Sequence, residues 1–311
     1  MPKRGQTIMM VPEPLPVMQV SVLGAGTMGH GIAQVAAMAG HEVTMRDIEA
    51  AYVEDGLDAI ESNLRGGVDR DKVTPDEMAA TLDRLSGTTS LEAAVADADL
   101  VVEAVPEDMG LKRETVAEVE SLVDDDAVIA SNTSSLSVTE ILSALERPER
   151  GLGLHFFNPV HIMGLVEVVV AEQTSESTLA FATEFVEGID KTAVEVGDSP
   201  GFASSRLGVA LGVEAMRMVQ EGVASPADID TAMELGYNHP MGPLELGDVV
   251  GLDVRLDILE YLREELGERF RPPQILKRKV RAGKLGKKTG EGFYVWEDGE
   301  IVGASEDVMD R

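Results

Sequence analysis

The sequence predicts an α/β protein, with a doubly wound, mostly parallel sheet followed by a second, all-helical domain. Up to about Pro200, short apolar runs alternate with helical stretches, which is the pattern of parallel strands joined by helices. Beyond Pro200, long amphipathic segments punctuated by glycine and proline replace this alternation, and no clear strand pattern returns before the last few residues. A chain of 311 residues is also long for one hydrophobic core, so two domains are expected.

The first elements are a strand, a turn, a helix and a second strand. An apolar run from Val17 to Leu23 predicts the first strand, and small and apolar residues at helical spacing then continue to Gly40. A second β-like run ends at Asp47. Residues 1–16 are interrupted by prolines and show no small-residue cleavage site, so we interpret them as an N-terminal extension and not as a signal peptide.

Four further strands are expected before the pattern changes. Helical stretches such as "LKRETVAEVESLV" separate strands along this part of the chain. The predicted strands are Leu100–Glu103, Ala127–Ser131, Gly151–Phe156 and Leu165–Val170. We therefore expect an α/β domain over 17–198 and a helical domain over 199–311.

Three glycines in the first turn form a dinucleotide-binding motif. Gly24, Gly26 and Gly29 have the spacing G-x-G-x-x-G, which allows a tight turn and a close approach to a pyrophosphate at the helix N-terminus. A carboxylate at Asp47 would accept hydrogen bonds from the ribose hydroxyls and repel a 2′-phosphate. The region 17–198 is therefore predicted to be a Rossmann-type domain that binds NAD rather than NADP. The positive charge of the neighbouring Arg46 would instead favour the 2′-phosphate of NADP. The glycine motif also occurs in proteins that bind FAD, so FAD stays an alternative at this point.

The chain is strongly acidic. Its 56 Asp and Glu residues against 26 Lys and Arg give a formal net charge of −30, and the acids are spread along the whole length. This charge disfavours nucleic acid and anionic membranes as partners. Salt would screen the self-repulsion, so we interpret the acidity as adaptation to a halophilic, high-salt cytoplasm.

Cysteine is absent from the sequence, which excludes disulfides, thiol nucleophiles and cysteine-ligated zinc. No metal site is predicted. Because no export signal is recognised, a cytoplasmic location is expected.

A histidine and a carboxylate lie in apolar runs where strands are expected. The stretch "LHFFNPVHIMGLVEVVV" contains His155 and Glu167. A buried carboxylate is costly unless it is paired, so we expect the two side chains to meet across neighbouring strands. The pair could serve catalysis or only the core. A second histidine of the stretch, His161, is predicted to be a solvated loop residue.

The residues exclude several dehydrogenase chemistries. None of the four tyrosines is followed by lysine four residues later, which excludes the tyrosine–lysine pair of short-chain dehydrogenases. Zinc alcohol dehydrogenases need cysteine ligands, and the absence of lysine between Gly201 and Pro273 disfavours the hydroxyisobutyrate type. A histidine base remains.

Seven motifs in order give the chain a resemblance to the 3-hydroxyacyl-CoA dehydrogenase family, including its 3-hydroxybutyryl-CoA members. They are "VLGAGTMGHGIAQVAAMAGHEV", "VVEAVPED", "ASNTSSL", "LHFFNPVHIMGLVEVV", "DSPGF", "HPMGPLELGDVVGLD" and "GKKTGEGFYVW". The resemblance implies a Rossmann-type domain, a helical C-terminal domain for dimerisation and substrate binding, a homodimer, and NAD-linked oxidation of the (S)-3-hydroxyl of an acyl-CoA.

The resemblance also implies roles for individual residues. His155 would be the catalytic base, Glu167 its orienting partner, and Ser134 a hydroxyl that contacts histidine and substrate. Besides the three glycines and Asp47, the implied NAD-binding residues are Thr27, Met28, Glu107, Lys112 and Asn132. The implied coenzyme A contacts are Asn63, Arg70 and Lys72. Ser205 stands where the family has a substrate-binding asparagine, which puts substrate identity in question.

The predicted function is that of a cytoplasmic NAD-dependent 3-hydroxyacyl-CoA dehydrogenase in fatty-acid β-oxidation or butanoate metabolism, with short acyl chains as candidate substrates. Two alternatives stay open. One is a related dehydrogenase of a 3-hydroxy acid without coenzyme A, and the other is a catalytically silent NAD-binding protein.

Overall fold

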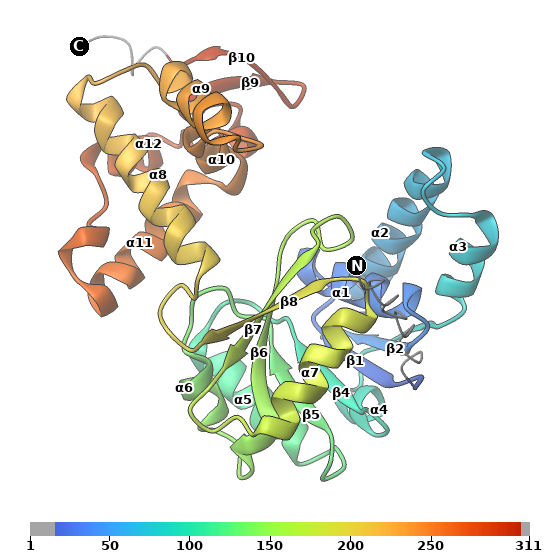
Figure 1. Cartoon of the computed structure of the whole chain (residues 1–311). Coiled ribbons are helices and arrows are strands. Elements are labelled where there is room, and N and C mark those ends of the chain that lie inside the picture. The colour runs from blue at the N-terminus through green and yellow to red at the C-terminus, as the bar shows by residue number, and fades with distance from the viewer. Residues whose placement is uncertain (1–15, 306–311) are drawn as a thin grey trace, which may run out of the picture. The chain divides into compact units, whose positions relative to one another are not determined.

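The computed structural model describes residues 16–305 of the chain (Figure 1). Of the extension predicted over residues 1–16, all but the last residue lie outside this range. The chain divides into two compact units between Asp198 and Ser199, and each unit has its own hydrophobic core. None of the helices in the described range is both long enough and apolar enough to cross a membrane.

The first unit is built on one eight-stranded sheet. Its strands are β1 (Gln19–Leu23), β2 (Glu42–Arg46), β3 (Leu85–Thr88), β4 (Leu100–Glu103), β5 (Val128–Ser131), β6 (Gly151–Phe156), β7 (Leu165–Val170) and β8 (Thr192–Gly197). The order across the sheet is β3-β2-β1-β4-β5-β6-β7-β8. All neighbours run parallel except β6 and β7, which are antiparallel. The predicted doubly wound, mostly parallel sheet is confirmed.

Helices cover both faces of the sheet, and Figure 1 shows α7 in front of it with α5 and α6 behind. Side chains of α1 and α7 share one core with β1, β2, β6 and β7. The helices are α1 (Thr27–Met38), α2 (Ala50–Asp69), α3 (Pro75–Leu82), α4 (Leu91–Val95), α5 (Met109–Glu120), α6 (Val138–Leu142), the 3-10 turn η1 (Pro148–Arg150) and α7 (Glu176–Gly188).

The two edge strands, β3 and β8, are the ones that the sequence does not predict. Central strands such as β4 and β5 are buried at every residue, so they read as continuous apolar runs. The edge strands have the sequences LSGT and TAVEVG and are largely exposed. An edge strand does not need apolar residues on both of its faces, so the continuous apolar run that marks a central strand is absent from its sequence.

The strand order places a ligand-binding position beside β1. The chain runs outward from β1 through β2 to β3 and then returns to add β4 on the other side of β1. Ligands of open α/β sheets bind beyond the carboxyl ends of the strands at such a reversal.

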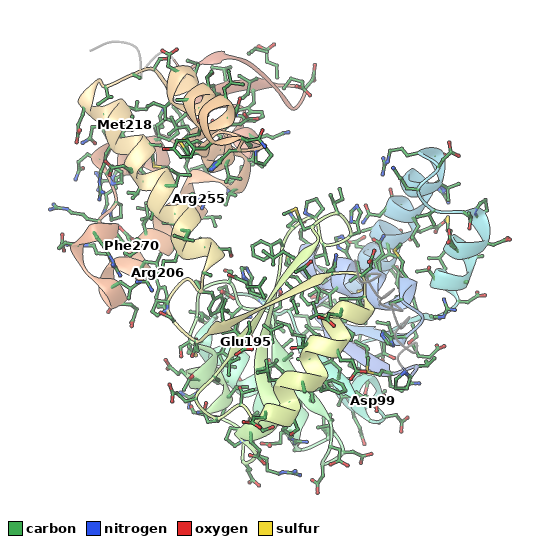
Figure 2. The ribbon with its side chains drawn as sticks, in the orientation of Figure 1. Asp99, Glu195, Arg206, Met218, Arg255 and Phe270 are labelled. Carbon is green, nitrogen blue, oxygen red and sulfur yellow. The ribbon has the colours of Figure 1, made fainter. Side chains whose placement is uncertain are left out.

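The second unit is helical and ends in a two-stranded hairpin. Its elements are α8 (Ser204–Glu221), α9 (Pro226–Tyr237), α10 (Pro243–Val250), α11 (Leu252–Leu266), η2 (Glu268–Phe270), α12 (Gln274–Arg281), η3 (Lys287–Thr289), β9 (Tyr294–Glu297) and β10 (Glu300–Ala304). Phe270, and in part Met218 of α8, pack in its core (Figure 2). The hairpin is an addition to the all-helical domain that the sequence predicts.

A buried aspartate of α10 anchors the hairpin. Asp248 accepts hydrogen bonds from the backbone N–H of Phe293 (2.8 Å), the backbone N–H of Tyr294 (2.9 Å) and the indole N–H of Trp296 (3.0 Å). A Cβ added at Gly292 would lie 2.1 Å from its Oδ1. The motif "GKKTGEGFYVW" therefore has a structural role in this unit.

Candidate active site

The glycine turn between β1 and α1 has no room for side chains on its inner side. Gly24 has a φ of +108°, and a Cβ added there would lie 2.5 Å from the carbonyl oxygen of Ala104. A Cβ added at Gly29 would lie 1.7 Å from the carbonyl oxygen of Gly24, whereas one added at Gly26 would meet no atom within 4 Å. The turn thus packs tightly against the protein and leaves open space at the helix N-terminus, as pyrophosphate binding requires.

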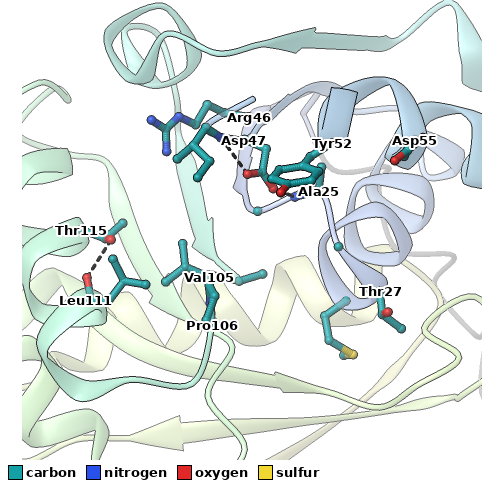
Figure 3. Close-up of a pocket in the computed structure, with 15 residues that line it drawn as sticks. Ala25, Thr27, Arg46, Asp47, Tyr52, Asp55, Val105, Pro106, Leu111 and Thr115 are labelled. Atoms are coloured by element: carbon teal, nitrogen blue, oxygen red, sulfur yellow. Dashed lines mark hydrogen bonds between the residues drawn. The ribbon is translucent and has the colours of Figure 1, made fainter. Parts of the chain in front are cut away.

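A pocket of about 670 Å³ opens beside this turn (Figure 3). Its volume lies in the range typical of cofactor sites, and it adjoins the carboxyl ends of β1, β2 and β4. Of the residues proposed from the sequence, those that line it are Gly24, Gly26, Thr27, Met28 and Asp47. A dinucleotide could therefore occupy this pocket with its phosphates at the glycine turn.

The Asp47 carboxylate is fixed at the wall of the pocket. Its Oδ2 accepts a hydrogen bond from the backbone N–H of Ala25 (2.8 Å), and its Oδ1 accepts one from the backbone N–H of Ile48 (2.7 Å). Figure 3 shows the Arg46 guanidinium pointing away from Asp47, and its Nε donates to the carbonyl oxygen of Thr89 at 3.3 Å. Both residues line the pocket, and the Asp47 carboxylate is the one hydrogen-bonded to the glycine turn.

A buried lysine joins two carboxylates beneath the loop that follows β4. The Lys112 Nζ of α5 lies 2.8 Å from Glu103 Oε1 and 3.3 Å from Glu107 Oε2. The side chains of Lys112 and Glu103 are each 1% exposed. Glu103 also accepts hydrogen bonds from the Ser131 hydroxyl (2.6 Å) and the backbone N–H of Val105 (2.8 Å). The Lys112 ammonium thus lies inside the protein, although the sequence suggests a direct cofactor contact.

Glu107 connects this pair to the "NTSSL" loop. Its Oε1 accepts hydrogen bonds from the Thr133 hydroxyl (2.7 Å), the Ser134 backbone N–H (2.9 Å) and the Ser134 hydroxyl (3.2 Å). Burial acts to raise the pKa of Glu107, but the Lys112 charge and the hydrogen bonds from Thr133 and Ser134 outweigh it and lower the pKa. Glu107 is therefore held as a carboxylate that positions the loop.

The same loop is attached to the strand that carries His155. Asn132, two residues before Ser134, accepts a hydrogen bond at its Oδ1 from the backbone N–H of Phe156 (3.0 Å). Phe156 directly follows His155 on β6. The Ser134 loop and the end of β6 are therefore neighbours.

His155 and Glu167 meet as the sequence predicts. They are paired across the antiparallel strands β6 and β7, and His155 Nδ1 lies 2.8 Å from Glu167 Oε2. The residues are 6% and 1% exposed, respectively. The Phe157 ring lies 4.5 Å from the imidazole, centre to centre. A hydrogen bond from Nδ1–H to the carboxylate selects the tautomer whose other nitrogen, Nε2, is basic.

The residues suggested for coenzyme A and substrate lie on α2, in the segment that follows it, and on α8. Asn63 on α2 donates from Nδ2 to Gln34 Oε1 on α1 at 3.2 Å. Arg70 follows the end of the same helix. Lys72 instead lines a separate hollow of about 300 Å³ together with Glu77 and Arg84. Ser205 belongs to the first turn of α8 in the second unit.

His161 lies in the turn between β6 and β7, but its predicted solvation is only partly right because the residue is half-buried. Burial, and then the charges of His30, Arg70 and Lys191, lower the pKa of its ring. Three segments distant in the sequence supply these charges.

Sequence reasoning missed three residues of the site. Glu103 carries the same signal as Glu167, which is a carboxylate in an apolar strand. Tyr52 and Asp55 line the cofactor-sized pocket, and their spacing of three residues on α2 places them on one helix face. Neither residue belongs to a recognisable sequence motif, so the sequence alone does not point to them.

Comparison with known proteins matches both units to one family. Residues 19–199 match the model for the NAD binding domain of 3-hydroxyacyl-CoA dehydrogenase, and residues 201–296 match the model for its C-terminal domain. The chain is 44% identical to a probable 3-hydroxybutyryl-CoA dehydrogenase of Bacillus subtilis over 283 residues, which cover 91% of this chain and 98% of the relative. It is 42% identical over 278 residues to 3-hydroxybutyryl-CoA dehydrogenase of Clostridioides difficile, which cover 89% and 99%.

Among solved structures, the chain resembles the (S)-3-hydroxybutyryl-CoA dehydrogenase of Ralstonia eutropha. The TM-score is 0.88 and the sequence identity 39%, and the match covers 91% of this chain and all of the other.

Proposed function

The chain belongs to the 3-hydroxyacyl-CoA dehydrogenase family and is an NAD-dependent enzyme, and on this premise we propose that it interconverts (S)-3-hydroxybutyryl-CoA and acetoacetyl-CoA. The observation that carries the proposal is the 2.8 Å contact between His155 Nδ1 and Glu167 Oε2. A base oriented by a buried carboxylate suits removal of a proton from a substrate hydroxyl.

We propose that His155 Nε2 takes the proton of the 3-hydroxyl during oxidation and returns it during reduction. Glu167 accepts the Nδ1–H bond throughout, which holds the ring in place and stabilises the imidazolium. NAD, when bound, supplies the hydride acceptor. The glycine turn and Asp47 would hold its phosphates and ribose, because only glycine fits at positions 24 and 29. Glu107 would position Ser134 near the reacting carbon.

The choice of substrate is tested by comparing oxidation of NADH with acetoacetyl-CoA, longer 3-oxoacyl-CoA thioesters and free acetoacetate. Preference for acetoacetyl-CoA would support the proposal. Activity on free acetoacetate alone would favour a dehydrogenase of acids without coenzyme A. NADH binding with no turnover of any of these would favour a catalytically silent protein.

We expect a preference for NADH over NADPH, because a 2′-phosphate would meet the fixed charge of Asp47. Asp47→Ala should narrow the ratio of kcat/KM values for the two cofactors by about tenfold, which corresponds to about 1.4 kcal/mol. Asp55→Asn, which removes the other carboxylate of the same pocket, is the matched control and should change the ratio less. Equal efficiency of the unmodified enzyme with both cofactors would contradict the assignment.

We further propose a homodimer formed by the second unit, in the cytoplasm of a salt-adapted cell. The unit exposes large apolar side chains on its helices, including Leu207 (71% exposed), Leu235 (83%) and Tyr237 (74%), as an interface would require.

The substrate is proposed to contact this unit through Ser205. Fatty-acid β-oxidation or butanoate metabolism would supply the acyl-CoA.

The melting temperature is expected to rise with potassium chloride, because a net charge of −30 repels itself when the Debye length grows to about 30 Å at about 0.01 M salt. Melting is measured from that concentration to about 1 M, with sucrose as an uncharged control. Light scattering on the same samples reports the mass. A melting temperature that does not change with salt would contradict the proposed salt adaptation. A monomer mass at every salt concentration would contradict the proposed homodimer.

A further inference from the structure

Asp198 is the last residue of the first unit, and its carboxylate is bonded to the segment that follows the "NTSSL" loop. Its Oδ2 accepts a hydrogen bond from the Ser137 hydroxyl (2.8 Å) and another from the backbone N–H of Thr139 (2.7 Å). Ser137 directly precedes α6, and Thr139 lies in its first turn. The carboxylate has no part in the chemistry proposed above, so its role must lie in what it holds.

The main chain on both sides of the Asp198 carboxylate is fixed. On the β8 side, the backbone N–H of Asp198 donates to the carbonyl oxygen of Val170 at the end of β7 (2.9 Å). On the other side, the backbone N–H of Phe202 donates to the carbonyl oxygen of Ser199 (2.8 Å), which closes a tight turn. Phe202 has a φ of +47° in this turn, a conformation that residues other than glycine rarely adopt. Asp198 therefore provides a fixed point for the groups that bind it.

The start of α6 is held by Asp198 and by the segment after β7. The Ser137 hydroxyl donates to Asp198 and accepts a hydrogen bond from the backbone N–H of Glu140 (3.2 Å), which caps the helix. The Thr139 hydroxyl accepts one from the backbone N–H of Glu172 (3.2 Å). One hydroxyl, that of Ser137, thus connects the helix, the preceding loop and Asp198.

The loop that precedes Ser137 is closed by its own hydrogen bonds. The Thr133 hydroxyl accepts from the backbone N–H of Ser135 (3.3 Å) and from that of Leu136 (3.0 Å). Thr133 and Ser135 are 1% and 8% exposed, respectively. Because these bonds leave few torsions free, a shift of Ser137 is passed on to Ser134 within the same loop.

Two carboxylates hold this loop, one at each end. Glu107 holds the first half, because its Oε1 accepts hydrogen bonds from the hydroxyls of Thr133 and Ser134 and from the Ser134 backbone N–H. Asp198 holds the end of the loop through Ser137. Without Asp198, the second half would lose its anchor and the Ser134 hydroxyl would be free to shift.

We propose that Asp198 is a positioning residue for the reaction, which sets the place of the Ser134 hydroxyl by holding Ser137 and Thr139. This proposal rests on the proposed function, in which Ser134 lies near the reacting carbon. A misplacement of about 1 Å at a reacting group can cost about a hundredfold in rate. Because the chain leaves the first unit at Asp198, the same carboxylate ties the course of the connecting segment to the loop.

Asp198→Ala is expected to lower kcat with acetoacetyl-CoA by about ten- to a hundredfold, while the KM for NADH stays nearly unchanged. Asp198→Asn should restore most of the turnover, because both hydrogen bonds end on Oδ2 and one amide oxygen can accept them. The matched control is Asp99→Ala. Asp99 is an exposed carboxylate of the same unit that accepts the backbone N–H of Gln19 at 2.7 Å (Figure 2), and its loss should leave kcat unchanged.

A double variant tests whether Asp198 acts through the loop. If it does, Ser134→Ala combined with Asp198→Ala should be about as slow as Ser134→Ala alone, because the two residues then serve one task. Losses of kcat that multiply in the double variant would overturn the proposal. A purely structural role would lower the melting temperature equally in Asp198→Ala and Asp198→Asn and would not separate kcat from the KM for NADH.

Ser137→Ala decides the matter if Asp198→Ala does not fold. It removes the hydroxyl that joins the loop to Asp198 but leaves the bond from the Thr139 backbone. We expect a smaller loss of kcat than in Asp198→Ala, again with the KM for NADH nearly unchanged. Normal turnover in a folded Ser137→Ala variant would overturn the proposal.

Amide hydrogen exchange gives a readout that needs no activity. Asp198→Ala should speed the exchange of the backbone N–H groups of residues 134–140, whereas Asp198→Asn and Asp99→Ala should not. If the unmodified enzyme turned over no acyl-CoA, the proposed function would fail, and this exchange would decide alone whether Asp198 positions the loop. Faster exchange confined to this segment would support the inference, and unchanged exchange there would overturn it.

Discussion

His155→Ala is expected to lower turnover by about a hundredfold to ten-thousandfold, while NADH binding stays nearly unchanged. The imidazole is the group proposed to move the proton, and it lies on β6 rather than in the pocket beside the glycine turn. Turnover is followed as oxidation of NADH with acetoacetyl-CoA, and binding by NADH fluorescence. Loss of binding together with turnover would indicate a damaged fold instead of a missing base.

Glu167→Gln provides the companion measurement. The amide keeps the shape of the side chain but not the charge that stabilises the imidazolium, so turnover should fall less than in His155→Ala. The double variant should be no slower than His155→Ala alone, because residues that act as one unit give non-additive losses. Additive losses, or near-normal turnover in His155→Ala, would show that the two residues do not form one base.

Lys112→Met is expected to lower the free energy of unfolding by about 3–5 kcal/mol, because it leaves the buried Glu103 carboxylate without its charge partner. Urea unfolding followed by circular dichroism measures the loss. Removing the charge of Glu103 as well, in Lys112→Met with Glu103→Gln, should recover much of it.

An exposed ion pair gives the control for this prediction. Arg263 and Glu268 are 40% and 66% exposed, so Arg263→Met should cost no more than about 1 kcal/mol. If Lys112→Met cost as little as Arg263→Met, the buried network would not be holding the loop after β4.

The sequence could predict those parts of the site that depend on local pattern. The glycine spacing, and a histidine and an acid in two consecutive apolar strands, are visible without a structure. Their meeting follows once β6 and β7 pair with His155 opposite Glu167. The network around Lys112 could not be predicted in the same way, because it requires α5 to lay its lysine against the end of β4.

Residues whose surroundings come from several distant segments also escaped prediction. The position of His161 in a loop was clear, but its neighbours on α1 and α2 were not, since no periodicity links them. The edge strands β3 and β8 were missed because exposure on their outer sides removes the apolar pattern that marked the central strands.

The reversed direction of β7 has a consequence for how such an enzyme can evolve. Because β7 runs antiparallel to β6, it begins on the side of the sheet where β1, β4 and β5 have their carboxyl ends. The segments that carry the chemistry therefore meet on that one side. Loops at these carboxyl ends can lengthen, shorten or change sequence without altering strand register or the core. The loops at the amino ends of these strands can meanwhile accumulate substitutions that tune stability. New substrate preferences and tolerance of new environments can therefore arise independently within the same scaffold.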